Sequence, residues 1–288
     1  MKKLLNITLL FVMAFAFVKC SDDEPVVDLS PKMLASEMEA LQAIYSELDM
    51  DAEDYPVHWD LENPNSWEGI ELDTIANEET GENVLVIKSI TIYLAKLFVH
   101  VPESLRKLSY LYELKIYGCE GSYFDGRRIP NTVKKLLVDR INPDEDQGYI
   151  WGVHYRSPIY PERLEVSLNY ETCFEEVTIH GVDMQSIGFN FEWDTKIDLS
   201  YNTLRGDVFT EYTRFLDRSA NLSHNQFSSL EEGWKYWIGN YMIRRSMPNL
   251  QYNDFKNIPE YVFESDFWKE NHEYFIGNPG YRPPVEKE

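Results

Sequence analysis

A short pattern occurs three times in the second half of this sequence. It consists of a leucine, an asparagine three residues later, and a leucine or phenylalanine two residues after that. The copies are DLSYNTL, NLSHNQF and NLQYNDF, which begin at Asp198, Asn221 and Asn249. Copies at similar spacing predict one structural unit that is repeated, and such units bury their apolar faces against their neighbours. The pattern therefore predicts a stack of repeats.

Segments upstream fit the same frame. LYELKIYGC, which ends at Cys119, matches a longer form in which alternating apolar residues precede an asparagine or cysteine. The first half of the frame recurs in IKSITI, VKKLLV and FEEVTI. Alternating apolar residues point to one side of a strand, so each copy predicts one short strand with its intervening residues exposed. We count seven repeats between about Val84 and Val262.

The asparagine has a physical role in this frame. Its side-chain amide both donates and accepts, so it can satisfy backbone groups where the chain leaves the strand. Cys119 takes the same position with a weaker S–H donor and is expected to be buried and structural. Segments after the strands also repeat, with VP at Val101 and IP at Ile129 and Ile258.

These features together resemble plant-type leucine-rich repeats, including their L-x-G-x-I-P segment. The closing GNPGY, which begins at Gly277, is similar to the end of such arrays. The resemblance covers roughly Leu34 to Tyr281. It implies an α/β fold, a leucine-rich repeat solenoid with a parallel β-sheet on its concave face and a helical N-terminal cap.

The predicted cap begins with ASEMEALQAIYSEL. Ser36 and Glu39 have the spacing of a capping box at a helix start. One helix face is apolar and contains Met38, Leu41, Tyr45 and Leu48. The following segment, with Trp59, Trp67, Gly69 and Ile70, resembles the cap of plant-type repeat proteins without its cysteines. Aromatic packing is expected to replace a disulfide there.

The frame is interrupted once, between Leu136 and Val177. We interpret Asn142 to Cys173 as an insertion, in which RLEVSLNY predicts a strand. The aromatic residues of the insertion either cover an edge of the core or form a ligand platform. They are Tyr149, Trp151, Tyr155 and Tyr160.

The N-terminus predicts export. Two lysines precede an apolar run from Leu4 to Val18, 15 residues that are too few for a spanning helix of about 20. Cys20 follows directly, and the segment resembles a bacterial lipoprotein signal in which this cysteine is acylated. The following SDDE resembles a tag for export to the outer leaflet of the outer membrane, facing the medium. The predicted segments are a signal peptide (1–19), a lipidated tether (20–33), the helical cap (34–83), the repeat domain with its insertion at about 142–173 (84–276), and a C-terminal tail (277–288).

Neither a catalytic motif nor a cofactor motif is present. The six histidines lack metal-ligand spacing, and DEDQG from Asp144 is far from a complete calcium loop. The net charge of −22 disfavours nucleic acid as a partner. We therefore expect no catalytic residue, no cofactor and no bound metal.

The frame also predicts which residues form the concave binding surface. They are Thr91, Tyr93, Lys115, Tyr117, Asp139, Thr178, His180, Asp198, Ser200, Asn221 and Ser223. Tyr93, Tyr117 and His180 occupy equivalent strand positions and predict an aromatic stripe. The favoured hypothesis is a surface-anchored protein that binds an extracellular protein or glycan through this face. The alternatives are a surface enzyme that acts on glycans and a structural envelope protein.

Overall fold

The computed structural model describes residues 31–51, 55, 57, 59–63, 67–94, 101–118, 124–126, 128–139, 166–168, 174–181, 194–208, 219–240 and 247–284. Cys20, Cys119, DEDQG and most of the insertion lie outside these residues. The chain divides into two units, Met1–Lys32 and Met33–Glu288. Among the described residues, no helix has the length and apolar character needed to cross a bilayer.

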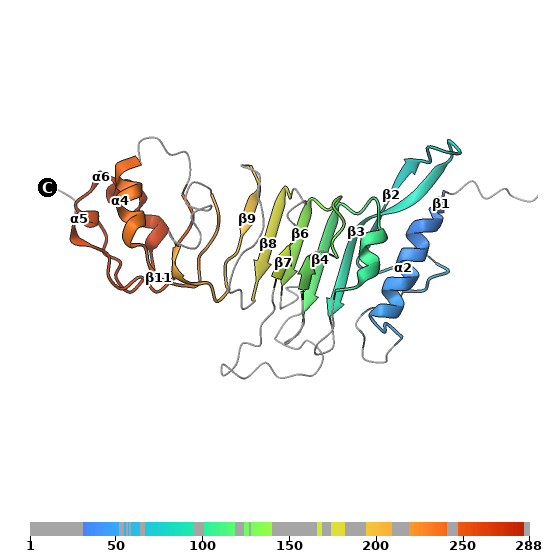
Figure 1. The fold of residues 1–288 in the computed structure, drawn as a ribbon, viewed down its shortest axis with the longest axis horizontal. Helices are drawn as coiled ribbons and strands as arrows, with labels where there is room; N and C mark the ends of the chain where they lie inside the picture. The colour runs from blue at the N-terminus through green and yellow to red at the C-terminus, as the bar shows by residue number, and fades with distance from the viewer. Residues whose placement is uncertain are drawn as a thin grey trace, which may run out of the picture. The chain divides into compact units, whose positions relative to one another are not determined.

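Parallel strands from successive repeats form the main sheet (Figure 1). Its neighbours in order are β3 (Asn83–Leu94), β4 (Glu113–Gly118), β6 (Lys135–Asp139), β8 (Glu176–His180) and β9 (Lys196–Asp198). Parallel bridges from Asp198 to Asn221 and from Asn221 to Asn249 continue the sheet into the next two copies. The predicted α/β class with a parallel sheet is confirmed.

The register of the strands shows why the apolar frame recurs. The second apolar residue of the frame in each copy lies beside its equivalent in the next, and these residues are at most 4% exposed. They are Ile90, Leu114, Leu136, Val177 and Ile197. Each strand alone buries little, so the core exists only because the copies are adjacent.

The asparagines form a hydrogen-bonded ladder, as expected from their amide chemistry. Asn225 Nδ2 donates to the carbonyl of Leu199 in the preceding copy (2.8 Å) and to that of Leu222 in its own (3.1 Å). Its Oδ1 accepts from the Leu204 N–H at 3.0 Å. Asn202 donates to the two equivalent carbonyls, and Asn253 repeats both the donations and the acceptance.

The ladder extends one copy beyond the three motifs seen in the sequence. Asn278 Nδ2 donates to the carbonyls of Leu250 and Phe275, both at 2.9 Å, and its Oδ1 accepts from the Phe255 N–H. The segment from Phe275 to Asn278 therefore acts as a further repeat. It lies partly in the segment that the sequence analysis assigned to the tail.

Two short parallel strand pairs are described outside the main sheet. β5 (Phe124–Gly126) pairs with β7 (Val166–Leu168), and β10 (Arg205–Asp207) pairs with β11 (Gln226–Ser229), both in parallel. β7 confirms the strand predicted within the insertion. Because β6 pairs directly with β8, the insertion adds no strand between them.

η2 (Glu103–Lys107) follows the VP segment at Val101, and α5 (Glu260–Phe263) follows the IP segment at Ile258. The described helices nearest the C-terminal end of the repeat array are α4 (Glu231–Asn240), α5, α6 (Asp266–Asn271) and η5 (His272–Phe275). Large aromatic side chains fill the space between the last copies and these helices. Trp234, Trp237, Trp268 and Phe275 are each at most 2% exposed.

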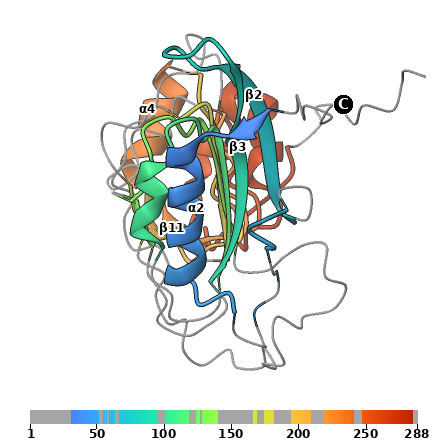
Figure 2. The same ribbon diagram turned by 90° about the vertical axis from the view of Figure 1, so that its right-hand side faces the viewer.

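The N-terminal cap consists of β1 (Lys32–Met33), α2 (Ala35–Glu47) and β2 (Ile70–Ala76), which pairs antiparallel with β3. α2 lies beside η2 (Figure 2), where Glu47 accepts from the N–H groups of Glu103 and Ser104. Trp59 and Trp67 are buried, and their indole N–H groups donate to backbone carbonyls. The expected aromatic packing of the cap is confirmed.

The predicted capping box was wrong. The N-cap of α2 is Leu34, whose side chain makes no capping bond, and Glu39 is exposed. In this turn, the carboxylate that makes hydrogen bonds to the backbone is Glu37. It is fully buried and accepts from the N–H groups of Ser109 (2.8 Å) and Ile87 (3.3 Å). The chain enters the helix directly from an extended segment, with the Leu34 N–H bonded to Leu85, so Ser36 lies inside the helix and not at its cap.

Candidate functional site

The residues predicted to line the concave face do lie on the side of the main sheet opposite the core. One row contains Thr91, Lys115, Thr178 and Asp198, with Leu137 between Lys115 and Thr178. A second row, nearer the strand ends, contains Tyr93, Tyr117, Asp139 and His180. Ser200, Asn221 and Ser223 continue the surface into the later copies. Their binding role stays a prediction.

The predicted aromatic stripe of this face is incomplete. Tyr93 and Tyr117 stack with ring centroids 5.5 Å apart, but Tyr117 is only 8% exposed. Asp139 then lies between Tyr117 and His180 in the register. Tyr117 therefore supports its neighbours and presents little surface to a ligand, contrary to what the frame predicted.

His180 joins two aspartates from neighbouring strands. Its Nδ1 lies 3.4 Å from Asp139 Oδ2 and its Nε2 lies 3.2 Å from Asp198 Oδ1. Hydrogen bonds to Asp139 and then Asp198 raise the pKa of His180 from 6.5 to about 9, and burial opposes them. The imidazole is thus a cation at neutral pH that neutralises part of an acidic surface.

Asp198 is also the start of a polar network that crosses the later copies. Burial raises its pKa, but hydrogen bonds from His180, Ser200 and Asn221 outweigh burial, so its pKa lies below the usual 3.8. Ser200 Oγ donates to Asp198 Oδ1 at 2.7 Å, and Asn221 Nδ2 donates to Asp198 Oδ2 at 3.1 Å. The next copy repeats this arrangement, with Ser223 Oγ donating to Asn221 Oδ1 at 2.9 Å.

Both serines of the predicted face, Ser200 and Ser223, are less exposed to solvent than the frame predicted. Ser200 is 1% exposed and Ser223 is 5% exposed. Each hydroxyl is turned toward the carboxylate or amide two residues before it in the chain. Their contribution is to fix the orientation of Asp198 and Asn221.

The cluster of Asp139, His180 and Ser200 has the composition of a catalytic triad. Ser200 Oγ lies 3.3 Å from His180 Nε2 and also donates to Asp198 Oδ1 at 2.7 Å. Hydrogen bonds to Asp139 and Asp198 raise the pKa of His180 to about 9, so the imidazole is mainly protonated at neutral pH and is a poor general base for Ser200. The cluster is therefore best described as an ion-paired network across three strands.

A second feature of this face is a stack of aromatic rings that the sequence analysis did not single out. Tyr201 and His224 have ring centroids 4.2 Å apart and nearly parallel planes, and His224 and Tyr252 follow at 4.5 Å. Tyr201 is 60% exposed and Tyr252 is 49% exposed. These three residues occupy the same position in the repeat, because each directly precedes a ladder asparagine in the sequence. We refer to Tyr201, His224 and Tyr252 as the aromatic stack.

The backbone of the aromatic stack is unusual. All three residues have positive φ, between 54° and 59°, a left-handed conformation that bulky side chains rarely adopt. The copies on either side place Gly181 and Gly277 at the equivalent position, also with positive φ. A Cβ on Gly277 would collide with the Tyr252 ring, so the stack ends there. Glycine is the residue that this turn prefers, and the rings are present despite a conformational cost.

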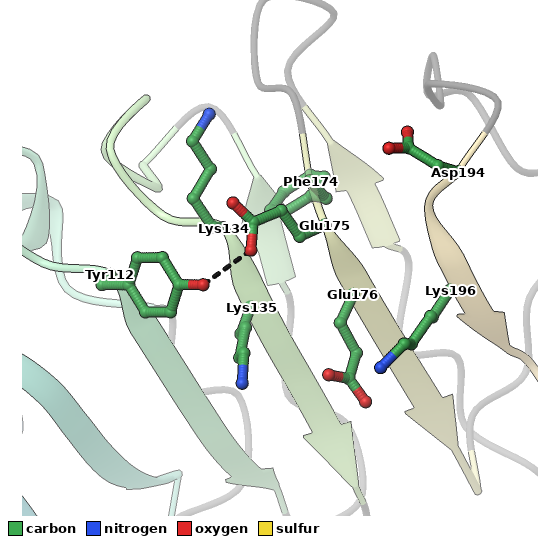
Figure 3. Close-up of a pocket in the computed structure, with 8 residues that line it drawn as sticks. All are labelled: Tyr112, Lys134, Lys135, Phe174, Glu175, Glu176, Asp194 and Lys196. Carbon is green, nitrogen blue, oxygen red and sulfur yellow. Dashed lines mark hydrogen bonds between the residues drawn. The ribbon is translucent and has the colours of Figure 1, made fainter.

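A hollow lies at the opposite, strand-start edge of the same face (Figure 3). Its volume is about 580 Å³. The residues that line it are Tyr112, Lys134, Lys135, Phe174, Glu175, Glu176, Asp194 and Lys196. The Tyr112 hydroxyl donates to Glu175 Oε2 at 2.6 Å, and this bond raises the pKa of Tyr112 above its usual 10. We refer to this feature as the strand-start hollow.

Among the residues that the structure describes, no group of three or more histidine, cysteine, aspartate or glutamate side chains is arranged to hold a metal ion.

No protein-family model matches the chain, and no curated protein sequence matches it. Among solved structures, the leucine-rich repeat ectodomain of the receptor kinase SOBIR1 from Arabidopsis thaliana is similar. The match has 17% sequence identity, covers 89% of this chain and 100% of that chain, and has a TM-score of 0.34. A TM-score this low does not establish a common fold, so the strand register remains the basis of the fold described above.

Proposed function

We propose that this chain is a leucine-rich repeat solenoid that binds an extracellular protein or glycan through its concave face. We further propose that it is a lipoprotein anchored through Cys20 to the outer membrane and facing the medium. The sequence features that support anchoring are the apolar run, the cysteine that follows it and the acidic SDDE. The support for binding comes from the concave face itself.

The observation that carries the binding proposal is the aromatic stack. Three consecutive copies expose an aromatic ring at a position where glycine would relieve the backbone. Rigid aromatic residues with polar tips are enriched at binding interfaces, where they supply large contact area at low entropic cost. A surface that keeps such residues at a conformational cost is better explained by recognition than by folding alone.

The adjoining polar network supports the same proposal. Asp198 and Asn221 are half-buried and held by several hydrogen bonds, so their orientation is fixed before a ligand arrives. Preorganised polar groups lose little entropy on binding. The concave face therefore offers rigid aromatic anchors beside rigid polar groups.

A double variant, Tyr201→Gly with Tyr252→Gly, tests this proposal. Both positions tolerate glycine in neighbouring copies, so the variant is expected to fold. The mature chain would be screened on arrays of glycans and extracellular proteins, and the affinity for any hit would be measured by calorimetry. We expect the variant to bind about 30-fold more weakly or worse, since truncated aromatic anchors often cost about 2 kcal/mol or more.

Tyr261→Ala is the matched control, because Tyr261 is 45% exposed on α5 and outside the concave face. It should leave the affinity unchanged. Undiminished binding by the double glycine variant, together with a lower melting temperature, would show that the rings serve stability only.

A further inference from the structure

The strand-start hollow is separate from the aromatic stack and has its own chemistry. It is formed by the first residues of β6, β8 and β9 and by residues just before β4, β6, β8 and β9. Its volume of about 580 Å³ lies within the range of ligand sites, about 300–1,000 Å³. Phe174 is only 2% exposed, so the accessible wall is polar apart from the Tyr112 ring.

The charges of the hollow cancel. Three lysines and three carboxylates line it. Three of these groups, Lys135, Glu176 and Lys196, are direct neighbours in the register and alternate in charge. Glu113 on β4 precedes them in the row but lies outside the hollow and is paired with Lys115. An anionic ligand would meet the carboxylates and a cationic ligand would meet the lysines. The electrostatic field of the hollow therefore favours a ligand with no net charge.

Hydrogen-bonding capacity narrows the class of ligand. Lysine offers only donors and an ionised carboxylate offers only acceptors. The backbones of neighbouring strands lie about 4.8 Å apart, so one ligand can reach lysines and carboxylates on successive strands. A hydroxyl group both donates and accepts, and a ring with several hydroxyls can use both kinds of partner at once. Hydrogen bonds to charged groups are also stronger than neutral ones.

Tyr112 supplies the remaining wall. Its hydroxyl is fixed by Glu175, and the Lys135 ammonium lies 5.9 Å from its ring centroid. The ring is therefore held at one side of the hollow, next to the charged row (Figure 3). An amphipathic ligand, with hydroxyls around its rim and apolar C–H groups on its faces, matches a polar row that ends at an aromatic ring.

We propose that the strand-start hollow binds sugar residues of a neutral glycan, which makes a glycan the ligand class of the concave face. This inference rests on the proposed binding function and specifies its ligand. A neutral sugar satisfies the alternating charges without adding one of its own. The exposed Glu175, Asp194 and Lys196 leave the hollow open to solvent, so it can accept one segment of a longer chain.

The test uses the mature wild-type chain and neutral hexasaccharides as probes: cellohexaose, xylohexaose, mannohexaose and maltohexaose. Dextran sulfate and chitosan oligomers serve as anionic and cationic comparators. Binding is measured by titration calorimetry. We expect at least one neutral hexasaccharide to bind, and to bind in preference to both charged glycans.

The decisive variant is Glu175→Gln with Glu176→Gln, which leaves the lysines unbalanced while keeping side-chain size. This variant should bind the neutral hexasaccharide with an affinity at least tenfold lower, and it should bind dextran sulfate more tightly than the wild type does. Glu270→Gln, an exposed change on α6, is the matched control and should alter neither. Melting temperatures of all variants show whether the fold is retained.

Three outcomes would overturn the inference: no neutral hexasaccharide binds, the double glutamine variant binds it as well as wild type, or wild type prefers dextran sulfate or chitosan. None of these outcomes removes the broader proposal. If Tyr201→Gly with Tyr252→Gly still abolishes binding to another array hit, the concave face is a binding surface and only its assignment to neutral glycans fails.

Discussion

Asn225 connects neighbouring repeats through a single side chain. Its amide donates to the Leu199, Leu222 and Ser223 carbonyls and accepts from the Leu204 N–H. Replacement by leucine keeps the size of the side chain but leaves these buried groups unpaired, at roughly 1–3 kcal/mol for each group that water cannot reach. We expect Asn225→Leu to lower the unfolding free energy, and the loss should be several times larger than the loss caused by Asn257→Leu.

Asn257 is the control because it is exposed and outside the ladder, so its replacement should change stability by at most about 0.5 kcal/mol. Urea unfolding followed by circular dichroism gives both values. Equal destabilisation of the two variants would contradict the ladder.

His180 makes stability depend on pH. Its pKa is raised from 6.5 to about 9 in the folded chain by Asp139 and Asp198. A raised pKa means that the ion pairs stabilise the fold fully below about pH 6.5 and lose this effect as the pH rises through 9. The melting temperature of the wild type should therefore fall between pH 7 and pH 9.5.

His180→Gln removes the titrating group, so its melting temperature is expected to be lower at pH 7 but nearly flat over this range. Differential scanning calorimetry compares the two proteins. An equal fall with pH in both would show that other groups cause the dependence.

At the scale of elements, α2 is fixed to the sheet by a buried carboxylate. Burial raises the pKa of Glu37, and the N–H groups of Ser109 and Ile87 partly offset this effect. Glu37→Ala leaves both N–H groups without their partner, so we expect a loss of roughly 2 kcal/mol or more of unfolding free energy. Glu39→Ala, an exposed change on the same helix, should cost far less. Both losses of unfolding free energy are measured by urea unfolding. A larger loss for Glu39→Ala than for Glu37→Ala would contradict this role of Glu37 and support the capping box.

At the scale of the whole molecule, the proposed lipid anchor can be tested independently of the proposed binding face. An acyl chain contributes about 0.8 kcal/mol of membrane binding per buried CH₂. Cys20→Ala should therefore move the protein from the membrane to the soluble fraction in cell fractionation. Changing Asp22, Asp23 and Glu24 to alanine should keep it in the membrane but hide it from external protease. Retention of Cys20→Ala in the membrane would contradict the lipid anchor.

The sequence by itself determined the repeat period, the strand positions and the role of the ladder asparagines. These features are local, because the alternation within one copy decides which residues face the core, and the recurrence of the frame brings equivalent residues together. The cap helix was predictable for the same reason, through its apolar face. The sequence places each ring of the aromatic stack directly before a ladder asparagine, but the stacking itself was not predicted.

Only the tertiary structure decided how the exposed residues combine. Asp139, His180 and Asp198 come from three separate copies, and no local pattern shows that their charges meet. Contacts between residues that are distant in the sequence also explain three other features. These are the burial of Tyr117, the alternating charges of the strand-start hollow, and the hydrogen bonds made by Glu37 instead of Glu39. Which polar group finds which partner depends on neighbours that are distant in the chain, and burial makes an unpaired group costly enough to fix the choice.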